Sequence, residues 1–281
     1  MMKTVIAAGF AALLPTTFLP RPASAPAAFG PRMVTVTAQD YSFDAPSSVP
    51  AGTIRLRLVN NGKELHHIQL VKLEQGKTLA DLNKAMESHG PPPAWFVEVG
   101  GPNAPALGST SEAIMTLDAG NYVLMCFIPS PDGAPHMMKG MVKTLTVTPS
   151  KEIPLEPKAD VVVKLVDYGF DISAPIVAGR QIIKIENTAE QPHEVFIVKL
   201  NAGKTPMDIA KWAEKLEGPP PGTPAGGATG LRKGRSMYIA ANLEPGRYGL
   251  ICFVPDAKDG KPHHAHGMMR EITVEAKVAA R

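Results

Sequence analysis

The sequence predicts an all-β protein made of two tandem antiparallel β-sandwich domains, each interrupted by one short helix. Gly occurs 25 times and Pro 28 times among 281 residues, which favours short strands and turns over long helices. The chain also repeats itself at an offset of 126 to 128 residues, and its length suits two domains. Each copy contains only one helical pattern, whereas parallel βαβ units would need more helices.

Residues 1–25 are predicted to be a secretory signal peptide. Lys3 supplies the positive charge, residues 4–14 an apolar run, and Ala-Ser-Ala at 23–25 a cleavage pattern. Pro26 is unfavourable directly after that site, so cleavage after Ala27 is an alternative, as is an uncleaved N-terminal anchor. The run is too short for a membrane span, which needs roughly 20 apolar residues. We therefore expect a periplasmic or secreted protein with no stable membrane insertion after cleavage.

The internal repeat places the two domains at residues 33–148 and 160–276. A segment rich in Pro, Lys and Glu at 149–159 is the predicted linker between them. The repeated motifs are Tyr-Ser-Phe-Asp at 41–44 and Tyr-Gly-Phe-Asp at 168–171, Gly-Pro-Pro-Pro at 90–93 and 218–221, and Cys-Phe-Ile-Pro at 126–129 and Cys-Phe-Val-Pro at 252–255.

Within each copy, alternation of polar and apolar residues predicts the strands. The clearest alternation occurs at 53–58 and 143–147, and in the second copy at 181–185 and 271–274. The second helix is expected to begin after the N-cap Thr205, with Pro206 at its first position and Asp208 at its third, and to end at Gly218. The equivalent helix of the first copy begins at Thr78.

Charge and cysteine content restrict the function. The net charge is only +3, and two of the positive residues, Lys3 and Arg21, lie in the leader. A nucleic-acid partner is therefore not expected, because phosphate binding needs a concentrated basic face. Two cysteines cannot form a disulfide framework. Three alternatives stay open for Cys126 and Cys252. They could form a single disulfide, be two buried thiols without metal, or each be a ligand in one of two metal sites.

Histidine, cysteine and methionine recur in the same order in both copies. In the first copy His66 follows a strand and an Asn, His136 comes ten positions after Cys126, and Met141 comes five later. The equivalent set in the second copy is His193, Cys252, His263 and Met268. A thiolate, two imidazoles and a distant thioether form the type of site that holds copper as Cu(I) and as Cu(II) with little rearrangement.

On these residues, both halves resemble cupredoxins, the blue or type 1 copper family. The Gly-x-Tyr strands that run into Cys126 and Cys252 resemble the family's approach strand. The resemblance implies a Greek-key β-sandwich in each half and up to two copper ions per chain. It implies that one copper is held by His66, Cys126, His136 and Met141, and the other by His193, Cys252, His263 and Met268.

The sequence departs from the family in two features. Many cupredoxins have Asn directly after the first ligand His, where this chain has His67 and Glu194. The loop from Cys to the second His is long, which is nearer the copper nitrite reductase pattern than the plastocyanin one. Because the second ligand His usually reaches the surface in this fold, electrons are expected to pass through His136 or His263.

The expected function is that of an exported copper-binding electron-transfer protein with one type 1 site per domain and an unidentified redox protein as partner. A periplasmic copper carrier or buffer is the alternative, and a metal-free interaction module remains open. The chain is expected not to be an enzyme. The family's enzymes often have His directly before the type 1 Cys, where this chain has Met125 and Ile251, and its only His-x-His pair is at 264–266.

Overall fold

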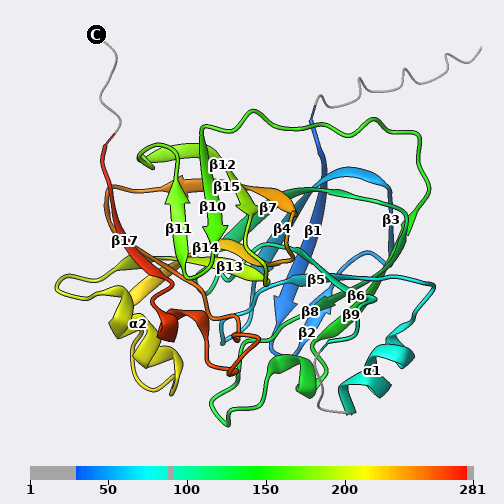
Figure 1. The fold of residues 1–281 in the computed structure, drawn as a ribbon, viewed down its shortest axis with the longest axis horizontal. Coiled ribbons are helices and arrows are strands. Elements are labelled where there is room, and N and C mark those ends of the chain that lie inside the picture. Colours follow the sequence, from blue (N-terminus) through cyan, green and yellow to red (C-terminus); the bar gives the residue numbers. More distant parts are fainter. Residues whose placement is uncertain (1–29, 88–91, 277–281) are drawn as a thin grey trace, which may run out of the picture. The chain divides into compact units, whose positions relative to one another are not determined.

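A computed structural model describes residues 30–87 and 92–276, which are mostly β-strand (Figure 1). The predicted signal peptide at 1–25 lies outside the described residues. The first half contains β1 (Arg32–Gln39), β2 (Ser42–Asp44), β3 (Ser48–Pro50), β4 (Gly52–Asn60), β5 (Gln69–Leu73), β6 (Phe96–Gly100), β7 (Thr110–Leu117), β8 (Gly120–Met125) and β9 (Val142–Thr148). The second half contains β10 (Val161–Val166), β11 (Gly169–Ile172), β12 (Gly179–Asn187), β13 (His193–Leu200), β14 (Gly222–Leu231), β15 (Ser236–Leu243), β16 (Gly246–Ile251) and β17 (Met269–Val274). The α-helices are α1 (Leu79–Glu87) and α2 (Pro206–Ala213), and single 3-10 turns cover His136–Lys139 and His263–His266.

The strands form two sheets that enclose the core. One sheet has the order β11-β10-β12-β15-β7-β4-β1-β2, and the other has the order β17-β16-β13-β14-β6-β5-β8-β9-β3. Strands that are consecutive in sequence, such as β4 and β5, often lie in different sheets, so the chain crosses between layers as in a Greek key. The predicted all-β class with two β-sandwiches is confirmed.

Each sheet continues from one half of the chain into the other. In one sheet β7 pairs with β15, with Ile114 opposite Tyr238, and in the other β6 pairs with β14, with Val99 opposite Leu231. The sequence did not predict this pairing, and residues from Pro31 onward form a single compact unit. The limits 33–148 and 160–276 for the two domains, with a linker at 149–159, remain predictions.

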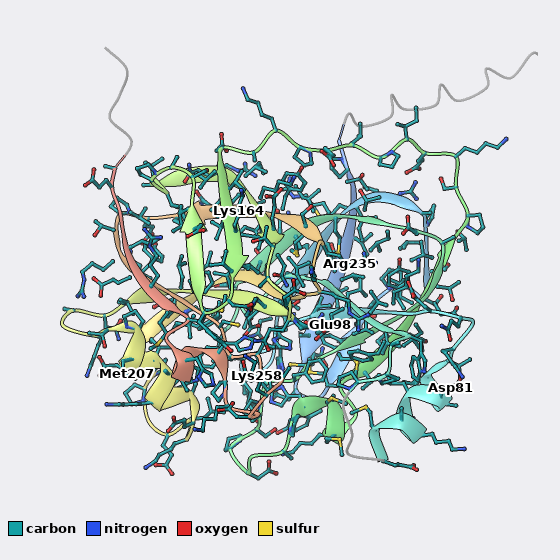
Figure 2. The ribbon with its side chains drawn as sticks, in the orientation of Figure 1. Asp81, Glu98, Lys164, Met207, Arg235 and Lys258 are labelled. Carbon is teal, nitrogen blue, oxygen red and sulfur yellow. The ribbon has the colours of Figure 1, made fainter. Side chains whose placement is uncertain are left out.

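Strand β4 shows how alternation builds the sandwich. Ile54, Leu56 and Leu58 point into the core and are at most 1% exposed. Arg55 and Arg57 alternate with them on the outer face, and both form ion pairs with Glu112 of β7. The same alternation in β10 leaves Lys164 exposed between buried neighbours (Figure 2).

Helix α2 begins as predicted. The Thr205 side chain accepts a hydrogen bond from the Asp208 amide, and the Asp208 carboxylate accepts one from the Thr205 amide. The predicted end at Gly218 was wrong, because the helix ends at Ala213. The chain turns away at Leu216, whose φ of 53° is left-handed and cannot continue a right-handed helix. No helix in the described part of the chain is long and apolar enough to cross a membrane.

Candidate metal centres

Three side chains that the sequence predicted as copper ligands converge in the first half. His66 Nδ1 lies 3.0 Å from His136 Nδ1, and Cys126 Sγ lies 3.5 Å from the same His136 atom. All three side chains are fully buried. We call this group the first centre.

The second half brings together the equivalent group, which we call the second centre. His193 Nδ1 lies 2.8 Å from His263 Nδ1. Cys252 Sγ lies 3.4 Å from His263 Nδ1 and 4.0 Å from His193 Nδ1. These side chains are also fully buried.

Backbone hydrogen bonds fold the late loop back onto the cysteine in both centres. Cys126 directly follows β8; its carbonyl accepts the Met137 amide at 2.9 Å, and its amide donates to the Met141 carbonyl at 3.4 Å. Cys252 follows β16 in the same way and donates to the Met268 carbonyl at 3.2 Å. Met141 and Met268 are fully buried beside the cysteines, and their role as thioether ligands remains a prediction.

Each histidine of the first centre has an outer ring nitrogen, Nε2, that faces a carboxylate, and an inner one, Nδ1, that faces the other histidine. The hydrogen bond at the outer nitrogen determines where the proton of the ring lies. In the first centre His66 Nε2 lies 3.1 Å from Asp40 Oδ1, and His136 Nε2 lies 2.8 Å from Glu64 Oε2. A carboxylate only accepts hydrogen bonds, so the proton between each pair is on Nε2, and a ring that carries this proton alone has a free lone pair on Nδ1. Two free lone pairs that face each other beside a thiol fit a bound cation, and this soft donor set suits copper.

Burial affects the two cysteines in the same direction. It raises the pKa of the Cys126 thiol to about 12 and holds the pKa of Cys252 well above its usual range. Both thiols are therefore protonated in the metal-free protein at neutral pH. A metal ion that binds the sulfur must displace that proton, so metal uptake is coupled to proton release.

The histidines predicted as second ligands do not reach the surface, which corrects the expectation for His136 and His263. Both are 0% exposed. The Tyr41 ring packs edge-on against His136 with centroids 5.4 Å apart, and Tyr168 packs against His263 at 5.7 Å. A tyrosine ring therefore packs against each of these histidines.

The residues that hold and cover the histidines were missed by the sequence reasoning. Asp40 binds the outer nitrogen of His66, and Asp167 binds that of His193 at 2.9 Å. Tyr41 and Tyr168 follow them with left-handed φ values of 65° and 60°. The signal was present, because the repeated Tyr-x-Phe-Asp motif is preceded by Asp in both copies.

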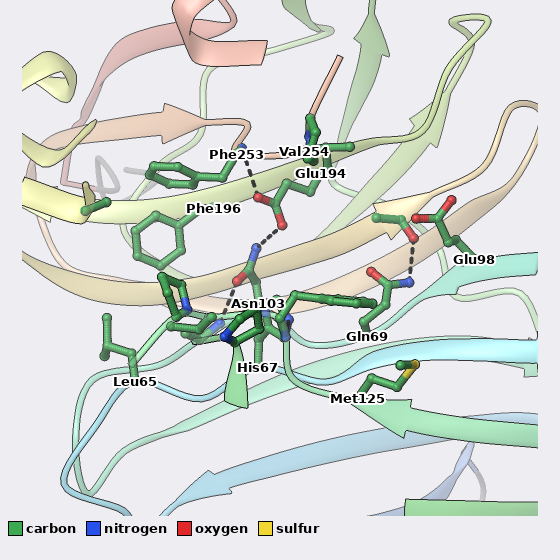
Figure 3. Close-up of a pocket in the computed structure, with 18 of the residues that line it drawn as sticks. Leu65, His67, Gln69, Glu98, Asn103, Met125, Glu194, Phe196, Phe253 and Val254 are labelled. Carbon is green, nitrogen blue, oxygen red and sulfur yellow. Dashed lines mark hydrogen bonds between the residues drawn. The ribbon is translucent and has the colours of Figure 1, made fainter. Parts of the chain in front are cut away.

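His67 and Glu194 tie the ligand loops together. His67 Nε2 accepts the Phe127 amide at 2.9 Å, and Glu194 Oε1 accepts the Phe253 amide at 3.0 Å (Figure 3). Each therefore bonds the residue directly after one of the two cysteines. Burial, followed by repulsion from His136, lowers the pKa of His67 to about 3, so His67 is neutral and its Nε2 can accept this hydrogen bond.

A mostly apolar cavity of about 710 Å³ lies beside these ties. Its lining includes Phe127 and Phe253, which follow the two cysteines, and Trp212 of α2. His67 and Glu194 contribute polar groups to the wall, and they come from different halves of the chain (Figure 3). The residues that follow the two cysteines therefore border a common space.

Comparison with known proteins finds no matching family model and no matching curated protein. Among solved structures, reduced auracyanin from Roseiflexus castenholzii is 23% identical, covers 43% of this chain and all of its own, and has a TM-score of 0.30. The blue copper oxidase from Nitrosomonas europaea is 15% identical over 88% of this chain and 86% of its own, with a TM-score of 0.27. The copper-containing nitrite reductase from Thermus scotoductus is 14% identical over 90% of this chain and 63% of its own, with a TM-score of 0.25.

The predicted resemblance to blue copper cupredoxins is confirmed, and the two His–Cys–His groups are compatible with up to two copper ions. The TM-scores are low, so the fold assignment depends on this chain's own strand order and on these two groups.

The expectation that the chain is not an enzyme was wrong. The similar structures that span most of this chain are named as a copper oxidase and a copper nitrite reductase, at 88% and 90% coverage, whereas auracyanin spans 43%. The residues before the two cysteines, Met125 and Ile251, do not decide whether the chain catalyses a reaction.

Proposed function

We propose that this protein is an exported copper protein that transfers electrons, with one type 1 copper site in each half. The observation that supports it most strongly is the arrangement of the first centre. There, carboxylates fix the outer nitrogens of His66 and His136, and the free inner nitrogens converge beside the Cys126 thiol. Copper bound there supplies a Cu(II)/Cu(I) couple that exchanges single electrons.

The proposal extends to the ligands, the partner and the location. Met141 and Met268 are the proposed fourth ligands, and the two sites fall in the domains proposed at 33–148 and 160–276. The partner is a redox protein, and the location is the periplasm or the exterior of the cell, to which a signal peptide at 1–25 would direct the chain.

A copper carrier or buffer is not favoured by the site geometry. All six His and Cys donor side chains are fully buried, and the loops that carry them are closed by backbone hydrogen bonds. A carrier must release its metal readily, whereas buried and interlocked ligands hold it. Slow loss of copper to a weak chelator, together with rapid electron exchange, is the behaviour expected here.

Copper loading of the purified protein tests the proposal. Cu(II) is expected to give the intense visible band of a copper–thiolate bond. Cys126→Ser and Cys252→Ser should each remove the absorbance that one site contributes to this band, and the double variant should remove the whole band. Ser130→Ala is the control, because Ser130 lies near the first centre and contacts Tyr41 but no ligand. A colourless Cu(II)-loaded protein whose two thiols still react with a thiol reagent would contradict the proposal.

A further inference from the structure

A buried amide joins the two halves next to both metal centres. Asn103, in the segment between β6 and β7, is 3% exposed. Its Nδ2 donates to Glu194 Oε2 at 3.1 Å (Figure 3). The carbonyl of Pro102, the residue before it, accepts the amide of Ile68, the residue after His67, at 3.1 Å. His67 belongs to the first half and Glu194 to the second, so the segment at Asn103 connects residues that are 127 positions apart in sequence.

These hydrogen bonds continue to both cysteines. His67 accepts the amide of Phe127, which is covalently bonded to Cys126. Glu194 accepts the amide of Phe253, which is covalently bonded to Cys252. An unbroken series of covalent bonds and hydrogen bonds therefore runs from one thiol to the other.

A single arrangement of protons satisfies the whole series. The Ile68 amide donates to the Pro102 carbonyl. Asn103 Oδ1 accepts the Ala104 amide at 2.8 Å, which leaves Nδ2 as the donor of the Asn103 side chain. The Asn103 amide group then donates to the Glu194 carboxylate, which accepts the Phe253 amide with its other oxygen. No link requires two donors or two acceptors to face each other. Because His67, Asn103 and Glu194 are each at most 8% exposed, the series is held in one geometry and is largely shielded from water.

Electronic coupling between two metal sites decays less steeply through covalent bonds and short hydrogen bonds than across van der Waals gaps. We propose that the series His67–Asn103–Glu194 is an electron path between the two copper sites of one chain. The inference rests on the proposed function, since it needs copper in both centres. One electron moves at a time: Cu(I) at one centre is oxidised to Cu(II) while Cu(II) at the other is reduced to Cu(I). No bond forms or breaks, and no proton is transferred.

The path gives the protein a use for two centres in one chain. A one-electron donor docked at one half can reduce the centre there. An acceptor docked at the other half can then receive the electron while the donor is still bound. In this arrangement His67, Asn103 and Glu194 are positioning residues, because they act through the ligand loops and do not touch the metal themselves.

Intramolecular electron transfer tests the path. Replacing Met268 by Leu in every protein compared is expected to give the second centre a distinct spectrum and potential, because the axial ligand tunes both. A brief radical pulse then reduces a fraction of the copper, and the redistribution between centres is followed as a first-order phase independent of protein concentration. Asn103→Leu breaks the hydrogen-bonded link and is expected to slow this phase about tenfold.

The matched control is Thr229→Val. Thr229 also makes a buried hydrogen bond between the halves, from its hydroxyl to the Ile68 carbonyl at 2.9 Å, but it does not belong to the path. The rate of electron redistribution in Thr229→Val should equal that in the parent protein. If Asn103→Leu does not fold, Asn103→Ser replaces it in the test. Its smaller polar side chain breaks the same hydrogen-bonded link.

A second readout uses the metal-free protein. Amide hydrogen exchange should show Phe127 and Phe253 protected both in the parent and in Asn103→Leu, because their acceptors, His67 and Glu194, remain. Slow redistribution with both amides still protected supports the path. Equal redistribution rates in Asn103→Leu, Thr229→Val and the parent overturn it. A parent protein without any copper–thiolate band refutes the proposed function itself, so the two failures are distinct.

Discussion

At the scale of single residues, the two centres differ in how they hold the second ligand histidine. In the first centre Glu64 Oε2 lies 2.8 Å from His136 Nε2. In the second centre the acidic residue is Asp256, whose Oδ2 lies 3.7 Å from His263 Nε2 and already accepts the Tyr168 hydroxyl at 2.5 Å. His263 Nε2 is the one buried side-chain nitrogen or oxygen of the described residues without a hydrogen-bond partner. The rings of His136 and His263 are therefore not equally strong donors to a metal.

Replacing Glu64 by Gln is expected to raise the reduction potential of the first centre. A hydrogen bond to a carboxylate makes the imidazole a more basic ligand, which stabilises Cu(II) over Cu(I), and the neutral amide weakens this effect. The potential is measured electrochemically in the Cys252→Ser background, where only the first centre binds copper. Gln191→Leu, at the equivalent position of the second half, is the control and should leave the potential unchanged. An unchanged or lower potential in Glu64→Gln would show that the carboxylate does not tune this centre.

Glu194 makes the stability of the metal-free protein depend on pH. Burial raises the pKa of Glu194 to about 7, above its ordinary value of 4.5, so between these two pH values the folded protein binds a proton that the unfolded chain has lost. The free energy of unfolding contributed by Glu194 therefore falls as pH rises from about 4.5 to about 7, by roughly 3 kcal/mol in total. Glu194→Gln removes this contribution. The difference in unfolding free energy between parent and variant, from urea denaturation at several pH values, should favour the variant increasingly up to pH 7 and then level off. A constant difference would show that Glu194 does not titrate in this range.

At the scale of the elements, the sequence predicted strands such as β4 and β9 because their buried and outward-facing residues alternate. The alternation at 53–58 lies within β4, and the ligand order placed His66, Cys126 and His136 together, since one strand end and one loop carry them. The turn that carries Asp40 could not be assigned to the first centre. Its contact with His66 depends on the long-range pairing of β1 with β4, which no local pattern reports.

The N-terminus of α2 gives a prediction for a local element. Thr205→Ala removes the side-chain acceptor for the Asp208 amide and should lower the free energy of unfolding by about 1 kcal/mol. Chemical denaturation measures the change. Thr205→Ser keeps the hydroxyl group and is the matched control, expected to behave nearly as the parent does. If serine destabilises the protein as much as alanine, the methyl group of Thr205 and not its hydrogen bond is what matters.

At the scale of the whole molecule, the two halves are joined as parts of one structure. Both sheets pass from one half to the other, and further bridges join Pro102 to Ala228 and Pro105 to Ala225. A repeat in sequence does not predict such pairing, because the residues at the junction need not be the repeated ones. A structure that shares its sheets and its core is expected to unfold in one cooperative transition.

Gly226 of β14 tests this cooperativity. It has a left-handed φ of 89°, and a Cβ added there would lie 2.8 Å from Ser111 Cβ of β7, so Gly226→Ala should lower the free energy of unfolding by about 1–3 kcal/mol. The fluorescence of Trp95 reports the first half and that of Trp212 the second, each measured with the other tryptophan replaced by Phe. Both signals should shift together in urea, because a clash at the junction loosens both halves. Gly203→Ala is the matched control: its φ of 72° is also left-handed, but no atom of another residue lies within 4 Å of the added Cβ, so it measures the backbone cost alone. If the urea midpoint of the Trp212 transition shifts while that of the Trp95 transition does not, the halves unfold separately, and the shared sheets do not couple them.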